Sequence, residues 1–497
     1  MAEGARIRSV AQVHRGYFAV FVLAQAALIC AAYLLSDEVP LFLVWAAAVP
    51  FGLVYLAYIP VYPWLMVPLL FATTALDITG QLIKETPLGI PLTGFHLSLG
   101  LMFVAIVLNA CLRRRLRFPP FSLQGPILSF LAVVGLSLTY TSNHPEATID
   151  FVRLIFLTLF LYGTEIIIDS RAAIITVLLS MAACMISASV LAVVQILTED
   201  FFLPASFVTA VGANTPRATG TFHNPNHLGT FLMSGIVILT AFYAHYPLRG
   251  PLRWLLFLAV AMGIGGLLST FSRANWMALI IGGGLGLQLA GKLRWKYIFG
   301  LLFVFALAIV SLKEFVPFAD HIFQRFASIF TLFNEFDSLG QVSSTARVYF
   351  VMAAFGMFFD NPLLGIGWRS YPVFLGDYKP ENFPHWIPTL ESHTTFATIF
   401  AEIGLVGVAV ALWFLWRVAN DTLAARRRMR DPFLRAILSS LIAVFVAFQV
   451  SISFTADFNN NFLWFFTGMI YAVIRLAREA DSKADGEAEG GGTGPAP

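Results

Sequence analysis

Apolar runs long enough to cross a lipid bilayer recur along almost the whole chain. A transmembrane helix needs about 20 predominantly apolar residues, and inside a bilayer only such a helix or a closed barrel satisfies its own backbone. The runs lie at about 17–35, 40–59, 62–76, 95–112, 121–139, 150–168, 172–197, 227–246, 252–269, 274–290, 296–312, 394–416, 433–453 and 460–476. Charged residues make up only 12 % of the sequence, whereas soluble domains carry roughly 25 %. The sequence therefore predicts an all-α, polytopic membrane protein of about 12–14 transmembrane helices with one large loop that contains short helices.

The longest polar interval, residues 313–393, divides this pattern. Residues 1–312 predict the first part of a transmembrane helix bundle, and residues 394–479 predict its C-terminal helices. The tail 480–497 is rich in Gly, Ala and acidic residues, which predicts disorder. Within the loop, residues 320–336 carry apolar side chains at helical spacing, which predicts an amphipathic helix on the membrane surface or one packed on neighbouring spans.

Basic residues gather between alternate apolar runs, and this pattern predicts the orientation of the chain. Cytoplasmic loops are enriched in Lys and Arg, so most of the 31 basic residues face the cytoplasm when both termini do. Arg6, Arg8 and Arg15 precede the first run, which reads as a signal anchor that is not cleaved. The loops that then share the opposite face are 198–226, 270–273, 313–393 and 454–459.

Two arginines of that opposite face lie close to the ends of spans. Arg217 lies in a segment rich in Gly, Asn and Pro that leads directly into a span, and Arg273 lies in a very short turn between two spans. An arginine near hydrocarbon is costly without a partner. Snorkelling to lipid phosphates is the structural alternative. Because a guanidinium binds phosphate oxygens through two parallel donors, and these loops hold no Asp-x-Asp pair for a magnesium ion, we predict that both arginines bind a diphosphate.

A histidine stands immediately before the apolar run at 394–416. An imidazole is the side chain best suited to accept a proton near neutral pH. His393 has Glu391 two residues before it and shares its face with Arg217 and Arg273. These features favour a general base over a structural histidine.

A second pair of histidines has the spacing of a zinc site but not its other features. His223 and His227 are four residues apart, yet Pro225 lies between them and no third ligand is evident. We therefore predict no metal site, and expect Asn224 and Asn226 to cap a helix that begins here.

Other polar residues of the same face are expected to support these groups. Asp457 lies at the outer edge of the last helical hairpin, where its carboxylate orients His393 or an arginine, or caps a helix. The further supporting candidates are Arg347, Glu391, His223 and Asn226.

Four segments, in this order, resemble the O-antigen ligase and O-antigen polymerase superfamily of bacterial envelope glycosyltransferases. They are TGTFHNPNHLG (219–229), LSTFSRANWMALI (268–280), TARVYFVMAAFGMFFDNPLLGIG (345–367) and SHTTFATIFAEIGLVG (392–407). The similarity covers about 210–410, and the first half matches only as a hydropathy profile. Members often have Asn directly after the histidine, where this chain has Thr394.

The resemblance implies an enzyme of the bacterial inner membrane that acts on its periplasmic face without metal or other cofactor. The implied donor is a glycan linked to undecaprenyl diphosphate, and the implied acceptor is a hydroxyl on a lipid- or glycan-linked molecule. His393 matches the catalytic base, Arg217 and Arg273 match the arginines that hold the donor diphosphate, and Asp457 matches a functional acidic residue. The expected partners are these substrates and membrane lipids, with no nucleic acid.

The expected reaction is inverting glycosyl transfer, in which the base takes the acceptor proton and the arginines stabilise the leaving diphosphate. Ligase and polymerase reactions both fit, since they share donor chemistry and differ in the acceptor. The alternative from another class is a transporter or flippase of lipid-linked saccharides. Such a protein needs polar groups at mid-membrane and often an internal repeat, whereas these spans are nearly free of charge and show no repeat.

Overall fold

The computed structural model describes the chain in several stretches and is built from helices throughout them. The described residues are 58–75, 93–113, 118–198, 217–222, 224–246, 248, 250–293, 342–379, 392–455 and 458–490. The elements are the 3₁₀ helix η1 (Pro63–Leu65) and the α-helices α3 (Met66–Ala75), α4 (Gly94–Leu112), α5 (Gln124–Ser137), α6 (His144–Ile167), α7 (Arg171–Thr198), α8 (Pro225–His245), α9 (Pro251–Ser269), α10 (Arg273–Leu289), α13 (Val342–Asp360), α14 (Tyr371–Tyr378), α15 (Thr395–Arg428), α16 (Pro432–Ile452) and α17 (Asn461–Gly490). These described stretches contain no strand.

The helices account for the predicted spans wherever the chain is described. Seven of them are long and apolar enough to cross a membrane, namely α4, α6, α7, α8, α9, α15 and α16. The shorter helices α3, α5 and α10 and the start of α17 coincide with the remaining predicted spans of the described stretches. Runs 17–35 and 296–312 and nearly all of 40–59 lie outside those stretches. The prediction of an all-α, multi-pass membrane protein is confirmed.

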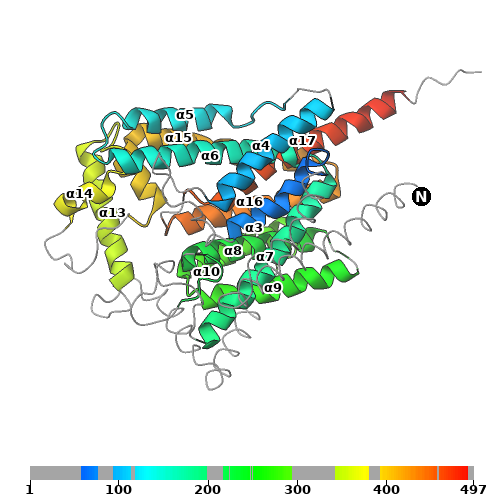
Figure 1. The fold of residues 1–497 in the computed structure, drawn as a ribbon, viewed down its shortest axis with the longest axis horizontal. Helices are drawn as coiled ribbons and strands as arrows, with labels where there is room; N and C mark the ends of the chain where they lie inside the picture. The colour runs from blue at the N-terminus through cyan, green and yellow to red at the C-terminus, as the bar shows by residue number, and fades with distance from the viewer. Residues whose placement is uncertain are drawn as a thin grey trace, which may run out of the picture.

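Helix α8 lies at the centre of the bundle. It packs against α9, α10 and α16, while α6 packs on α17 and α7 packs on α3 and α9. In Figure 1, α7 to α10 form the lower part of the bundle, α4 to α6 form the upper part, and α3 and α16 lie between them. Buried residues occur all round α8, as expected of a helix that is apolar on every side and therefore lies inside a bundle.

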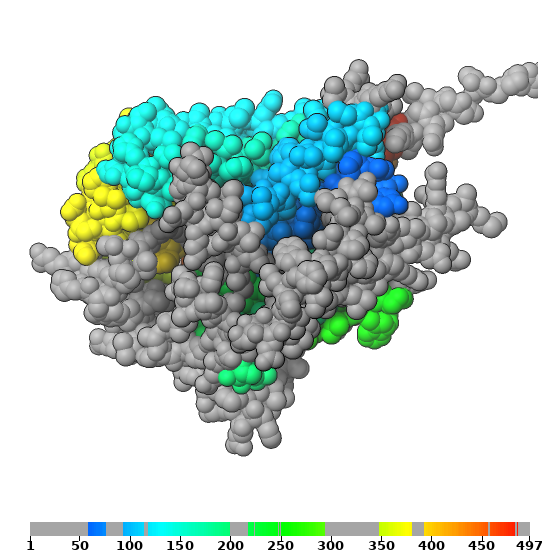
Figure 2. Space-filling view, in the orientation of Figure 1, coloured from blue at the N-terminus to red at the C-terminus, as the bar shows by residue number. Residues whose placement is uncertain are grey.

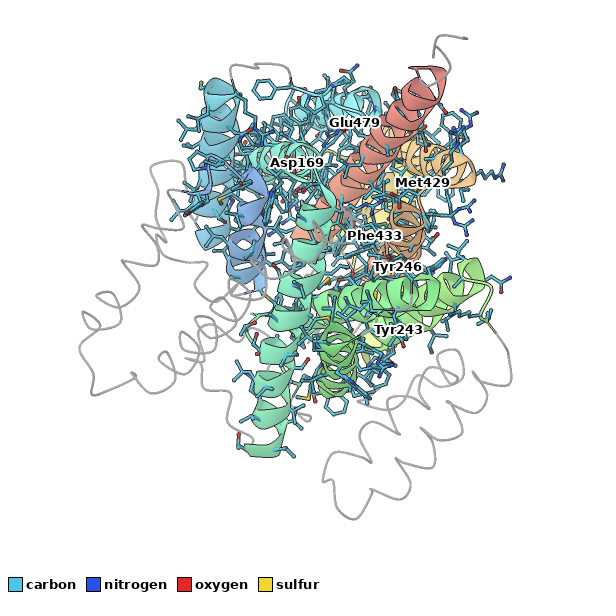
Figure 3. All side chains as sticks on the ribbon, turned by 90° about the vertical axis from the view of Figure 1, so that its right-hand side faces the viewer. Asp169, Tyr243, Tyr246, Met429, Phe433 and Glu479 are labelled. Carbon is cyan, nitrogen blue, oxygen red and sulfur yellow. The ribbon has the colours of Figure 1, made fainter. Side chains whose placement is uncertain are left out.

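Different segments of the chain meet at the two ends of the bundle. One end, here called the site end, joins the following residues through hydrogen bonds: Thr141 with Trp368 and Ser370, Ala218 with Ser269, and Thr395 with Thr455. The other end, here called the basic end, joins Arg171 with Asp431, Arg426 with Leu289, and Arg475 with Glu165 and Ile168. The site end lies on the left of Figure 1, where α13 and α14 are, and Figure 3 looks onto the basic end, with Asp169, Met429 and Glu479 facing the viewer.

Residues 342–379, the main described part of the loop 313–393, form two helices that pack on the start of α15. Helices α13 and α14 form a small apolar cluster with it, made by Phe350, Ala353, Ala354, Met357, Ile366, Tyr371, Leu375, Ala397 and Ala401. Tyr140 and Thr141, just after α5, donate hydrogen bonds to the carbonyl oxygens of Leu364 and Trp368. Figure 2 shows α14 beside α5 and α6 at the left edge. The predicted amphipathic helix 320–336 lies outside the described residues.

The run 394–416, predicted as one span, is broken in the structure. Gly404 has φ 59° and ψ −159°, a non-helical conformation inside α15. Residues 405–428 are long enough to cross the membrane alone, because about 20 residues suffice. Residues 395–403 therefore form a separate helical piece that begins beside His393.

Backbone hydrogen bonds stabilise this break. Amides 366 and 367 donate to the carbonyls of Ala401 and Glu402, each at 2.9 Å, and amides 405 and 406 donate to the carbonyls of residues 362 and 363 at 2.9 and 3.2 Å. Irregular backbone at membrane depth persists only where its polar groups are satisfied in this way. A Cβ atom at Gly404 would lie 2.5 Å from the carbonyl oxygen of Leu363, so the two segments meet only because glycine is there.

The tail departs from the prediction of disorder. Helix α17 continues to Gly490, and residues 491–497 lie outside the described stretches. Asp485 pairs with Arg430 at 2.7 Å, and Glu479 pairs with Arg475 at 3.4 Å. Adding residues to an existing helix avoids the unfavourable nucleation step, so the alanines and acidic residues of this segment extend α17 in spite of its glycines.

Candidate functional site

Arg217 is bound at the site end by two neutral oxygen atoms. Its Nε donates to the carbonyl oxygen of Thr270 and its Nη2 to Oδ1 of Asn226, both at 2.9 Å. The following residue, Ala218, donates its amide to the carbonyl of Ser269 at 3.0 Å. The half-buried Arg217 thus joins the turn before α8 to the turn between α9 and α10.

A buried amide on α7 holds the segment that carries Arg217. Gln195 is fully buried. Its Oε1 accepts hydrogen bonds from the amides of Thr219 and Gly220 at 3.1 and 2.8 Å, and its Nε2 donates to the carbonyl of Gly220 at 3.2 Å. Gln195 was not predicted as a site residue, because a single glutamine near the end of an apolar run carries no pattern that marks a partner far along the chain.

Arg273 is the first residue of α10, directly after a serine that contacts the same asparagine as Arg217. Ser272 precedes the helix without capping it through its side chain, and its Oγ donates to Oδ1 of Asn226 at 3.1 Å. The two arginine-bearing turns therefore meet at one amide oxygen. The prediction that Asn226 caps α8 is wrong: Asn224 is the cap, and its side chain accepts from the amide of Asn226 at 2.8 Å.

His393 lies in front of α15 with a strained backbone and an aromatic neighbour. Its φ is 53°, uncommon for a residue other than glycine. Its ring lies 5.8 Å, between centroids, from that of Phe350 on α13. Arg347 precedes Phe350 by three residues, so both lie on one face of α13. Burial, and then the charge of Arg347, lower the pKa of His393 to about 4, so the half-buried imidazole is neutral at pH 7.

A chain of hydrogen bonds joins the start of α15 to the arginine turns. Thr395 Oγ1 donates to the carbonyl of Thr455, and Thr455 Oγ1 donates to the carbonyl of Ser451, both at 3.1 Å. Ser451 Oγ donates to Oδ1 of Asn275 on α10 at 2.8 Å. His393, two residues before Thr395, and Arg273, two residues before Asn275, thus belong to the same end of the bundle.

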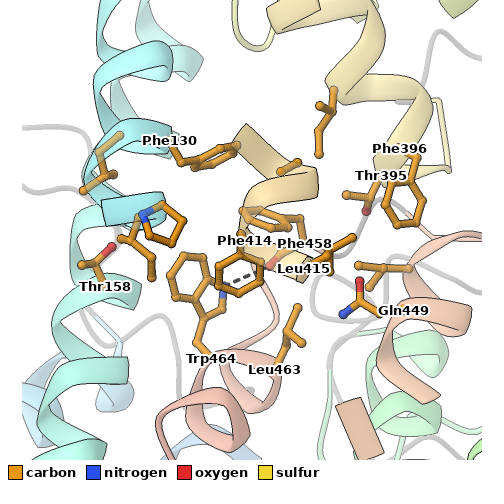
Figure 4. Close-up of a pocket in the computed structure, with 16 residues that line it drawn as sticks. Phe130, Thr158, Thr395, Phe396, Phe414, Leu415, Gln449, Phe458, Leu463 and Trp464 are labelled. Carbon is orange, nitrogen blue, oxygen red and sulfur yellow. Dashed lines mark hydrogen bonds between the residues drawn. The ribbon is translucent and has the colours of Figure 1, made fainter. Parts of the chain in front are cut away.

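An apolar pocket lies beside the start of α15 (Figure 4). It is enclosed by α5, α6, α15, α16 and α17, and most of its lining is aromatic or aliphatic. Trp464 donates its Nε1 to the carbonyl of Phe458 at 3.1 Å within the lining. Thr395 and Gln449 are polar members of the wall. At this level α16 turns Gln449 and Ile452 towards the pocket and Ser451 towards Asn275.

A buried carboxylate fastens the loop before α14 to the bundle. Asp150 on α6 is 2 % exposed. Its oxygens accept hydrogen bonds from Trp368 Nε1 at 2.9 Å and Asn459 Nδ2 at 2.7 Å, and Arg369 lies 3.9 Å away. A buried carboxylate needs such partners to offset its desolvation. Asp150 was absent from the predicted site and lies near its edge.

Three predicted supporting residues, Asp457, Glu391 and His223, lie outside the described residues. His227 is half-buried on α8. Over the described stretches, no group of three or more His, Cys, Asp or Glu side chains is arranged to hold a metal ion.

Residues 257–412 match a protein-family model described as O-antigen ligase. The matched segment runs from α9 into α15 and includes Arg273, Arg347 and His393, while Arg217 and Asn226 precede it. A comparison with curated proteins found no match to the chain. The family match confirms the resemblance to the O-antigen ligase and polymerase superfamily and supports a glycan-processing function of that type.

Proposed function

We propose that the protein transfers a glycan from an undecaprenyl-diphosphate carrier to an acceptor hydroxyl, with inversion at the anomeric carbon. The observation that carries this proposal is the shared polar network of the site end. It joins the turns that carry Arg217 and Arg273 to the start of the helix that follows His393.

The arginine turns suit a diphosphate leaving group. Guanidinium groups bind phosphate oxygens through paired donors and remain charged. Arg273 also opens α10, whose N-terminus carries the positive end of the helix dipole. Charge that develops on the leaving diphosphate is therefore stabilised where these two turns meet, and no metal ion is needed for that role.

His393 supplies the base. The acceptor oxygen forms a bond to the anomeric carbon, the bond from that carbon to the diphosphate oxygen breaks, and its electron pair leaves with the diphosphate. The acceptor proton passes to the neutral imidazole. An anionic donor beside His393 raises the pKa of the imidazole and opposes the effect of Arg347, so the donor makes His393 a stronger base.

The apolar lining of the pocket suits contact with a short part of the lipid chain of the carrier. Its lining is aromatic and aliphatic, and it begins at Thr395, next to the base. With the positive-inside rule, the proposal orients the site end towards the periplasm and both termini towards the cytoplasm.

The test is glycan transfer by purified protein in vesicles that contain the lipid-linked donor. His393→Ala should lower the rate by about 10²–10⁴-fold, the usual contribution of a general base, while the protein still inserts in the membrane and stays folded at neutral pH. His144→Ala is the matched control, since His144 is exposed at the start of α6. Arg273→Lys should also be severely impaired, because an ammonium group cannot reproduce two parallel donors.

Wild-type transfer by His393→Ala would overturn the proposed base. Vesicles in which the wild-type protein moves the donor across the bilayer, yet forms no product, would instead support a transporter. What accumulates in a deletion strain identifies the acceptor: long glycans left on the carrier indicate a ligase, and single repeats on the final acceptor indicate a polymerase.

A further inference from the structure

Asn275 is the buried centre of the polar network at the site end. It lies two residues into α10 after Arg273 and is 0 % exposed. Its Nδ2 donates to the carbonyl oxygen of Asn226 at 3.1 Å and to Oγ of Ser272 at 3.0 Å. Its Oδ1 accepts from Ser451 Oγ at 2.8 Å and Thr230 Oγ1 at 3.2 Å. The two donors and two acceptor positions of this amide are all used.

The two ends of this amide act on different parts of the site. The Nδ2 side holds Asn226 and Ser272, which meet at the oxygen that binds Arg217. The Oδ1 side holds Ser451, whose carbonyl is bound by Thr455, and Thr455 in turn binds the start of α15. One side chain therefore sets both the geometry within the arginine turns and their distance from the histidine helix.

Close packing restricts which side chains fit at position 275. A Cβ atom at Gly229 would lie 2.6 Å from Nδ2 of Asn275, so α8 passes very near the amide. A longer glutamine side chain has no room there. Aspartate keeps the volume but, when ionised, loses both donors and faces the carbonyl of Asn226.

We propose that Asn275 is a positioning residue for glycan transfer: through Nδ2 it holds together the two turns that bind the donor diphosphate, and through Oδ1 it holds those turns at working distance from His393. This inference rests on the proposed function. It assigns no contact between Asn275 and substrate.

The two sides of the amide predict different kinetic effects. Asn275→Asp damages the arginine turns, so inorganic pyrophosphate, used as a competitive inhibitor of transfer, should bind about tenfold more weakly, as expected from lost hydrogen bonds. Ser451→Ala removes the hydroxyl that joins Asn275 to α16, and through α16 to the start of α15, and it leaves the hydrogen bonds of Nδ2 in place. Its kcat should fall about tenfold or more while the inhibition constant of pyrophosphate stays unchanged, because small displacements between reacting groups cost rate.

Ser440→Ala is the matched control for Ser451→Ala. Both serines are fully buried on α16, but Ser440 donates only to the carbonyl of Ala436 within its own helix. The experiment uses the full-length protein in detergent and measures kcat, KM for the donor, pyrophosphate inhibition and thermal unfolding. Ser440→Ala should leave the kinetic constants as in wild type.

If Asn275→Asp and Ser451→Ala fold and retain wild-type kcat and pyrophosphate inhibition, this inference is overturned but the proposed function is not. Equal losses of kcat in Ser451→Ala and Ser440→Ala would also overturn it, since they would indicate a packing effect. If Asn275→Asp fails to fold, the comparison of Ser451→Ala with Ser440→Ala decides. A wild-type protein that forms no product and is not inhibited by pyrophosphate would overturn the proposed function itself, and the inference with it.

Discussion

The two ends of the bundle are held together by different kinds of polar contact. At the site end, buried amides and hydroxyls such as Asn275 and Ser451 bond one another across helices. At the basic end, arginines bond backbone carbonyl oxygens and carboxylates, and some of these arginines are exposed: Arg171 is 55 % exposed and Arg430 is 67 % exposed in their pairs with Asp431 and Asp485.

This difference matters because the two kinds of contact respond differently to mutation. Leaving a buried donor or acceptor without its partner costs about 1–3 kcal/mol, and the surrounding helices shift to recover it. An exposed ion pair contributes about 0–1 kcal/mol, and when a mutation removes one partner, water hydrates the other. The site end therefore fixes geometry, and the basic end mainly distributes charge.

The largest effect is expected from the backbone break at the site end. Gly404→Ala requires a non-glycine residue at φ 59° and brings its Cβ to 2.5 Å from the carbonyl oxygen of Leu363. We expect a loss of about 3 kcal/mol or more, or failure to fold, from strain and contact together. Thermal unfolding in detergent measures it.

Gly284→Ala is the control for this prediction, since a Cβ there meets nothing within 4 Å and the residue lies inside α10. It should stabilise the protein by up to about 1 kcal/mol. Similar unfolding temperatures for Gly404→Ala and wild type would show that the break does not depend on glycine.

The next effect concerns the titration of His393. Its pKa is about 4, lowered by burial first and by Arg347 second. Since the neutral form acts as the base, kcat/KM of the free enzyme should stay level from pH 7 downwards until near pH 4. Arg347→Gln should move this acid limb upward, but short of the ordinary value of 6.5, because burial remains. Rates measured between pH 4 and 8 check this.

The same pKa has a consequence for stability with a definite sign. In the unfolded chain His393 takes up a proton below pH 6.5, whereas in the folded protein it does so only near pH 4. Wild-type stability should therefore fall more steeply than that of His393→Ala as the pH drops from 6.5 to 4. Lys292→Gln, at the basic end, should leave both profiles unchanged, and an equal shift in that variant would contradict a local effect.

The smallest effect is expected at the basic end. Asp431 caps α16 by accepting from the amides of Phe433 and Leu434 at 2.8 and 3.1 Å, besides pairing with Arg171. Asp431→Ala should cost about 1–2 kcal/mol through the lost cap. Asp431→Asn keeps the cap, removes the charge and should cost about 1 kcal/mol or less. A larger loss of stability in Asp431→Asn, measured by thermal unfolding, would show that the ion pair with Arg171 stabilises the protein more than an exposed ion pair usually does.

The sequence alone predicts which loops lie at the same end of the bundle, because counting the membrane spans gives the side of each loop. Each apolar run changes the side of the membrane, so the segments with Arg217, Arg273 and His393 were expected at one end, and the structure brings these three segments to one end. The hydrogen bonds that support these segments could not be predicted from the sequence. Asn226 reads as a helix cap, and Asn275 reads as a single polar residue in a span, since a hydrogen bond between helices leaves no local periodicity.

By itself, the sequence determined that the chain is an all-α membrane protein, because lipid offers backbone groups no partners and long apolar runs must become helices. It also predicted which loops lie together at one end of the bundle. Only the tertiary structure decided that the run after the loop forms a helix broken at Gly404, and that Asn275 joins the arginine turns to α15. Both depend on contacts between residues far apart along the chain, whose geometry exists only after the helices have packed.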